Sequence, residues 1–310
     1  MTAYNTAPGP DPDERSRTRA GLLAGFGAYG IWGLLPLYFV VLDPAAPLEI
    51  VALRVLFSLV FCLALLTLTR RLGALGRALR TPRTLAALAL AGLLIGVNWF
   101  LYVLATTTGH TIEASLGYFI NPIVAILLGV VVLRERMRRM QWAAVGVGFV
   151  AVVVMAVFYG SVPWLSLGLA FSFGLYGLVK NRVGASFPAV VTLTVETLAL
   201  TPVAAVVVAV LAADGALTLG TEGPGHAALL LAAGGITAVP LILFGAAASR
   251  LPLSTVGMIQ YMTPIMQFLL AVLVLGERMP LERWVGFCFV WLAVLLLVLD
   301  AVRAPRARRA

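Results

Sequence analysis

The chain has 310 residues, of which 61% are hydrophobic and only 11% are charged, and its mean hydropathy is +1.02. A water-soluble domain is about 45–50% apolar and about 25% charged, so this composition excludes a soluble fold and predicts a polytopic membrane protein. The net charge of +9 does not indicate a nucleic-acid partner, because most of the arginines lie in short loops between apolar runs, where positive-inside topology explains them.

Ten apolar runs follow one another along the chain, each near the roughly 20 residues that a helix needs to span a bilayer. Their expected bounds are 20–41, 48–69, 84–105, 113–133, 142–158, 162–180, 189–212, 226–248, 254–275 and 284–302. The polar residues 1–19 are expected to form a disordered cytoplasmic tail, and residues 303–310 a basic cytoplasmic tail.

The positive charges orient these spans, because arginine-rich loops stay on the cytoplasmic side of a bilayer. With a cytoplasmic N-terminus, 19 of the 22 lysines and arginines fall on the cytoplasmic side. Only Arg278 and Arg283 fall on the outer side, and Arg54 lies within a span. The charges therefore predict ten transmembrane helices with both termini in the cytoplasm.

The second half of the chain repeats the first. PIVAILLGVVVLRERM at residues 122–137 matches PIMQFLLAVLVLGERM at residues 264–279, an offset of 142 that Trp142 and Trp284 keep. The first ERM lies among further arginines, most of which the second lacks, which indicates that the two copies have opposite orientations in the membrane.

The fold prediction is therefore an all-α integral membrane protein built from two inverted five-helix repeats. The first repeat is expected at residues 20–158 and the second at residues 162–302. An odd number of spans in each half makes the second half enter from the opposite side. Many secondary transporters have this architecture.

Two ionisable residues lie inside predicted spans and are separated by the repeat offset, Arg54 and Glu196. Arg54 would hold an anionic substrate group or form an outer gate, or it would snorkel toward the membrane surface. Glu196 would be a protonatable coupling site or an inner gate, or it would bond a neighbouring threonine or amide. Glu113, near the outer start of a span, would cap that helix or contact substrate.

Several segments resemble the RarD proteins, in the EamA branch of the drug/metabolite transporter superfamily. They include GLLAGFGAYGIWGLLPLYF (21–39), EASLGYFINP (113–122) and RLPLSTVGMIQYMTP (250–264). The resemblance implies ten helices in two inverted halves, and a central cavity lined by the first, third and fourth helices of each half. It also implies a permease of the bacterial inner membrane, with a family name linked to chloramphenicol sensitivity. Leu53 and Thr106 depart from the family pattern, which has a histidine and an asparagine near these positions.

Polar and aromatic residues of the predicted spans form the candidate wall of this cavity. Asn98 and Tyr102 share one helix face, as do Tyr118 and Asn121. The full set is Trp32, Asn98, Trp99, Tyr102, Tyr118, Asn121, Tyr176, Gln260 and Tyr261. Pro122, Pro240 and Pro264 are expected to kink their helices and free backbone carbonyls. The alternative is that these groups only join helices by hydrogen bonds and aromatic packing.

The sequence predicts a transporter rather than an enzyme, with no cofactor and no metal site. A phosphate-binding loop, an HExxH motif and a GxSxG motif are all absent from the sequence, which excludes the common signatures of ATP hydrolysis and hydrolytic catalysis. The expected function is secondary transport, as an exporter or permease, of small metabolites or drug-like amphipathic molecules by alternating access. Its expected partners are that small-molecule substrate, the lipid bilayer and, if Glu196 couples transport, protons. A non-transporting receptor or an intramembrane lipid-modifying protein is the alternative.

Overall fold

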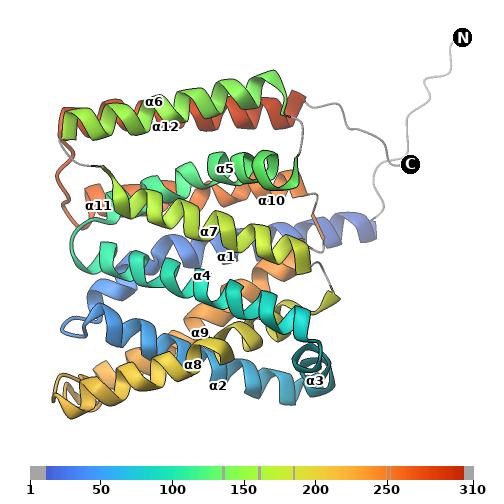
Figure 1. The fold of residues 1–310 in the computed structure, drawn as a ribbon, viewed down its shortest axis with the longest axis vertical. Coiled ribbons are helices and arrows are strands. Elements are labelled where there is room, and N and C mark those ends of the chain that lie inside the picture. Colours follow the sequence, from blue (N-terminus) through green and yellow to red (C-terminus); the bar gives the residue numbers. More distant parts are fainter. Residues whose placement is uncertain are drawn as a thin grey trace, which may run out of the picture.

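The computed structural model describes residues 12–134, 137–159, 162–183, 186–248, 250–251 and 253–303 (Figure 1). Every regular element in these ranges is a helix. The helices are α1 (Pro12–Val41), α2 (Pro47–Leu68), α3 (Leu72–Arg80), α4 (Pro82–Thr107), α5 (Thr111–Leu133), α6 (Arg139–Tyr159), α7 (Trp164–Val183), α8 (Ala189–Ala213), α9 (Gly223–Ala248), α10 (Leu253–Gln260), α11 (Met262–Leu273) and α12 (Leu281–Arg303).

The length and composition of these helices are those of a multi-pass membrane protein. Within the described ranges, seven helices are long and apolar enough to cross a bilayer. Shorter apolar stretches lie at Arg139–Met155, Trp164–Lys180 and Met262–Leu273. Large apolar side chains such as Val131, Phe149 and Leu273 are exposed on the outside of the bundle, where lipid replaces water as the solvent.

The described ranges contain helical elements beyond the ten predicted membrane spans. One addition is α3, whose nine residues are too few to span a bilayer. It buries Leu75 and Ala78 and carries Arg77 in its last turn, a pattern typical of a helix lying at a surface. The other addition arises because the ninth predicted span is divided at Tyr261 into α10 and α11.

The predicted disordered tail at residues 1–19 is too long, since α1 already begins at Pro12. A proline in the first helical turn is a favourable helix start, because its missing N–H needs no partner there. Residues 1–11 and most of the predicted C-terminal tail (304–310) lie outside the described residues.

The two halves of the chain are interlocked. The most extensive helix pairs join different halves: α6 with α12, α5 with α7, α2 with α8, and α1 with α9. Figure 1 shows α6 and α12 side by side along one edge of the bundle. The repeat relates these contacts to one another: α7 packs on α4 in the same way that its repeat mate α1 packs on α9. Neither half therefore buries its apolar faces alone.

The largest buried apolar cluster lies at the contact between the halves. Phe39 on α1 and Leu53 on α2 meet Leu169 on α7 and Leu230 on α9 in this cluster. Its members are almost fully inaccessible, so these helices cannot separate without exposing apolar surface. The core thus holds together the helices that carry the polar residues described below.

Two glycines at the repeat offset, Gly92 and Gly234, set the closest approaches between helices. A Cβ atom at Gly92 on α4 would lie 2.7 Å from the backbone oxygen of Glu196 on α8. A Cβ atom at Gly234 on α9 would collide with the backbone carbonyl of Phe57 on α2. Because the obstacle is backbone in both cases, the helices approach this closely only with glycine at these positions.

Replacing Gly234 with alanine is expected to lower the melting temperature of the purified protein in detergent, because overpacking a tight contact typically costs about 1–3 kcal/mol. The matched control is Gly245→Ala on the same helix, where an added Cβ meets no atom within 4 Å. Thermal unfolding measures both variants. Equal melting temperatures for the two would contradict the close contact between α2 and α9.

Candidate functional site

Arg54 on α2 lies inside the bundle with only 4% of its surface exposed. Its Nε donates a hydrogen bond of 2.8 Å to Oγ1 of Thr237 on α9, which joins the two halves of the chain. The guanidinium lies 4.4 Å from the ring centroid of Trp99 and 5.6 Å from that of Phe39. These cation–π contacts offset part of the roughly 2.5–3.5 kcal/mol that an arginine costs at the centre of a membrane helix.

Tyr102 and Gln267 form a second connection between the halves. Gln267 on α11 donates from Nε2 to the Tyr102 hydroxyl at 2.7 Å and to the backbone oxygen of Trp32 at 3.1 Å. One turn earlier on the same helix, Thr263 donates to the backbone oxygen of Tyr29 at 2.8 Å. The helix α11 is therefore held to α1 and α4 by side-chain hydrogen bonds that no water can replace inside a bilayer.

Asn98 on α4 connects three helices. Its Nδ2 donates to the backbone oxygen of Leu169 and to Oγ of Ser172, both on α7 and both at 3.1 Å. Its Oδ1 accepts a hydrogen bond of 3.3 Å from the Tyr118 hydroxyl on α5. The rings of Tyr102 and Tyr118 meet edge to face, with their centroids 5.5 Å apart. Asn98, Tyr102 and Tyr118 therefore meet at one place in the bundle.

These residues form one site, which we call the central cluster: Arg54, Asn98, Trp99, Tyr102, Tyr118 and Gln267. Two of its members, Arg54 and Gln267, and the nearby residue Asn121 each have a buried polar atom without a hydrogen bond among the described residues. These atoms are Nη1 of Arg54, Oε1 of Gln267 and Oδ1 of Asn121. Buried polar atoms normally find partners, and exceptions in a native structure point to strain, to a function or to a missing ligand.

Glu196 lies apart from the central cluster and has its own partners. Its Oε1 accepts from Nζ of Lys180 at 2.6 Å, and its Oε2 accepts from the Tyr176 hydroxyl at 3.2 Å. Lys180 also donates to Oγ1 of Thr192 at 2.6 Å. Although Arg54 and Glu196 are mates in the repeat, they are not paired with each other, because the structure gives each of them different neighbours.

The other aromatic and amide residues predicted for the cavity are not members of the central cluster. Trp32 packs against Tyr29 and Phe244, whereas Tyr176, its mate in the repeat, packs against Phe173 and hydrogen-bonds Glu196. These mates therefore belong to different clusters and do not form a common stack. Gln260 ends α10 and Tyr261 separates it from α11, and both are partly buried.

The three predicted kink prolines differ in their effect on helix continuity. Helix α5 runs through Pro122 and helix α9 runs through Pro240. Pro264 lies in the first turn of α11, just after the break at Tyr261. A proline in a first turn removes an N–H that has no intrahelical partner, so this position is compatible with a helix start.

Carboxylates gather at the end of the bundle that carries the connections α1–α2, α4–α5, α8–α9 and α11–α12, on the left in Figure 1. We call this the capped end. The carboxylate of Glu277 accepts hydrogen bonds from the backbone N–H groups of Thr111 and Ile112 at 2.6 and 2.9 Å. The carboxylate of Glu49 accepts from the N–H groups of Thr218 and Leu219 at 2.8 and 3.0 Å. Both contacts join one half to the other.

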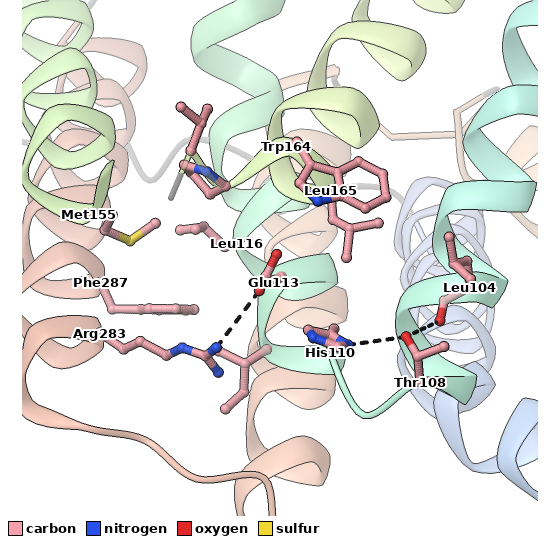
Figure 2. A pocket seen from close by; sticks show the side chains of 13 residues that line it. Leu104, Thr108, His110, Glu113, Leu116, Met155, Trp164, Leu165, Arg283 and Phe287 are labelled. Carbon is pink, nitrogen blue, oxygen red and sulfur yellow. Dashed lines mark hydrogen bonds and ion pairs between the residues drawn. The ribbon is translucent and has the colours of Figure 1, made fainter. Parts of the chain in front are cut away.

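A cavity of about 470 Å³ opens at the same capped end (Figure 2). Figure 2 shows Met155, Phe287 and Arg283 on one side of it, and Leu104, Thr108 and His110 on the other. Glu113 reaches toward Arg283, with 3.7 Å between Oε1 and Nη2. Of the predicted site residues, only Glu113 lines this cavity, so the cavity is separate from the central cluster.

Sequence reasoning missed several residues that complete these sites. Gln267 had a usable signal, because Gln260, Thr263 and Gln267 follow helical spacing and share one face. Glu277 belongs to the repeated ERM motif, which was interpreted only as a marker of the repeat. Lys180 and Thr237 had no sequence signal, since each is defined only by a partner on another helix.

Comparisons with known proteins agree with this architecture. The EamA-like transporter family matches the chain twice, over residues 19–157 and 161–299. Protein RarD of Streptomyces exfoliatus is 52% identical over 293 residues, which are 94% of this chain and 92% of that protein. Protein RarD of Salmonella typhi is 42% identical over 295 residues, which are 95% of this chain and all of that protein.

A solved crystal structure shares the fold, with a TM-score of 0.60 at 20% sequence identity, covering 92% of this chain and 99% of that one. The family match covers most of the chain in two copies, and the relatives cover nearly all of it. The chain therefore belongs to the EamA-like transporter family, as a RarD-type membrane transporter.

Proposed function

We propose that the protein is a secondary transporter of the bacterial inner membrane that exports small amphipathic metabolites or drug-like molecules by alternating access. The observation that carries this proposal is that the central cluster is made by both halves of the chain. Arg54 bonds Thr237, and Tyr102 bonds Gln267, in each case across the two halves. In transporters built from repeats, the substrate site lies at such a contact, near the middle of the bilayer.

The proposed topology has ten membrane crossings in two inverted halves, residues 20–158 and 162–302, with both termini in the cytoplasm. In this arrangement α10 and α11 together form the ninth crossing, and α3 lies on the cytoplasmic face. The capped end then faces the outside. The start of α1 and the end of α12 lie at the opposite end of the bundle in Figure 1, which supports an even number of crossings.

The proposed transport cycle opens the central cluster to one side at a time. In this cycle the described conformation is closed at its outer end by two carboxylates. Glu277, in the α11–α12 connection, binds backbone N–H groups at the start of α5, and Glu49 on α2 binds those of the α8–α9 connection. Because each contact joins the two halves, outward opening has to break it. At the opposite end of the bundle, Arg138, just before the start of α6, donates from Nε to Asp300 on α12 at 2.9 Å. This contact joins α6 to α12, so in the proposed cycle the two helices move together.

Glu196 is the proposed site of proton coupling. Its carboxylate is 1% exposed and is bound to Lys180 and Tyr176. Protonation would end the ion pair and release Lys180 toward solvent, since that side chain is already 28% exposed. A proton at Glu196 would thereby change the contact between α7 and α8. The same residue of α8 lies against Gly92 on α4, so this change would occur where the two halves are in close contact.

Alternating access is expected to expose Ser172, a neighbour of Asn98, to each side of the membrane in turn. We would introduce Ser172→Cys after replacing Cys62 and Cys288 with alanine. Glu277→Ala should then speed labelling by an impermeant thiol reagent from outside and slow it from inside. Glu222→Ala, which removes an exposed carboxylate of another outer loop, is the control. Labelling that Glu277→Ala leaves unchanged on both sides would contradict the proposed gate.

Inversion of the halves predicts opposite locations for two exposed repeat mates, Arg139 at the start of α6 and Leu281 at the start of α12. An impermeant reagent applied to intact cells should label Leu281→Cys but not Arg139→Cys. Both should react after the membrane is opened, which controls for reactivity. Labelling of both positions from one side would rule out inverted repeats.

Proton coupling predicts that the access of Ser172→Cys depends on pH through Glu196. With Glu196 intact, acidification should shift labelling between the two sides, because the protonated carboxyl no longer binds Lys180 as an ion pair. With Glu196→Gln, which mimics the protonated form, the labelling ratio should stay constant with pH. The same pH response in both proteins would exclude Glu196 as the coupling site.

A further inference from the structure

The charges inside the helical bundle are not balanced. The described ion pairs join Arg138 to Asp300, Lys180 to Glu196, and Arg283 to Glu113. Arg54 takes part in none of them, although it is more deeply buried than any of these three cations. The central cluster therefore carries one positive charge that no carboxylate of the described chain neutralises.

The surroundings of Arg54 stabilise its charge only in part. Thr237 occupies Nε, and the rings of Trp99 and Phe39 face the guanidinium. Nη1 has no partner. A guanidinium presents its N–H groups in a planar fork that matches the two oxygens of a carboxylate or phosphate. An oxyanion on a ligand would both accept from the unused Nη1 donor and neutralise the charge of Arg54.

The other open groups of the cluster describe the rest of that ligand. Oε1 of Gln267 is a buried acceptor that no described donor reaches, so it suits a ligand hydroxyl or amine. The rings of Phe39, Tyr102 and Tyr118 follow one another edge to face, and they form an apolar surface beside the charge. A ligand that fits carries an anionic group on a flat or apolar body.

We propose that the substrates of this transporter are organic anions, and that Arg54 binds their carboxylate or phosphate group. The inference rests on the proposed transport function and specifies the charge of the substrate. A cationic substrate is disfavoured, because Glu196 already has Lys180 as its counter-ion. The anion supplies the missing counter-charge at the contact between the halves, so binding joins α2 of one half to a ligand that both halves enclose.

The test uses pairs of probes that share a shape and differ in charge: phenylpropionate with phenylpropionamide, and chloramphenicol hemisuccinate with chloramphenicol. Ligands that bind the folded protein raise its melting temperature. We expect the anion of each pair to stabilise the purified protein and its neutral partner to have a smaller effect. Arg54→Met should weaken anion binding about 10- to 100-fold, as for the loss of a charged hydrogen bond, and Arg54→Lys should weaken it less.

Stability of the ligand-free protein distinguishes binding from a structural role. Replacing an unbalanced buried charge by an apolar side chain of similar length removes its desolvation penalty. The empty Arg54→Met protein should therefore melt no lower than the parent, although it has lost affinity for anions. A fall in its melting temperature, together with unchanged anion binding, would assign Arg54 a structural role and overturn the proposal.

Two further results would overturn it: equal stabilisation by the neutral and anionic members of each pair, or no stabilisation by either anion. These outcomes are separable from failure of the transport proposal. If Ser172→Cys is labelled alternately from both sides while anions show no preference, alternating access stands and only the anionic substrate class is lost. If labelling never alternates but Arg54 still binds anions, the site stands without the transport cycle.

Discussion

The bilayer interior offers no water to the polar side chains at the contact between the two halves, so these side chains bond to one another or stay unsatisfied. Arg54 is hydrogen-bonded to Thr237, and Gln267 to Tyr102, and each bond joins one half of the chain to the other. Breaking such a bond inside a membrane leaves two polar groups without partners. The contact between the halves is therefore stable only where these groups meet. Helix positions in which these groups have no partner are therefore unfavourable. A contact of this kind favours discrete states over continuous flexing.

The repeat mates Arg54 and Glu196 have different surroundings. Each places a charge inside a helix, and among the described residues only Glu196 has a counter-ion. Lys180 neutralises Glu196 within the second half, whereas Arg54 keeps Thr237 and two aromatic rings as its neighbours. A buried charge without a counter-ion destabilises a fold that could have used an apolar side chain. The proposed anionic ligand would supply the counter-charge that Arg54 lacks at the contact between the halves.

The capped end of the molecule relies on hydrogen bonds to backbone groups more than on ion pairs. Glu277 and Glu49 each accept two backbone N–H groups from the opposite half. Such bonds are charge-assisted and directional, and they satisfy donors that a helix start or a loop leaves open. They also depend on the distance between whole helices. Because a small displacement of one half breaks both bonds of a carboxylate together, the contact is suited to open and close as a unit.

The sequence alone determined the class of the protein, the positions of its apolar helices and the internal repeat, because hydropathy, charge and repeated motifs are local properties of the chain. It also predicted Asn98, Tyr102 and Tyr118 as residues of one cavity wall, since helical spacing relates neighbouring positions, and it singled out Arg54 separately by the repeat offset. Only the tertiary structure decided which partner each polar group has, and it revealed the short surface helix α3 and the break at Tyr261. The choice of Lys180 for Glu196, or of Gln267 for Tyr102, depends on the rotation and height of each helix. Those are set by packing between halves about 142 residues apart, which no local pattern encodes.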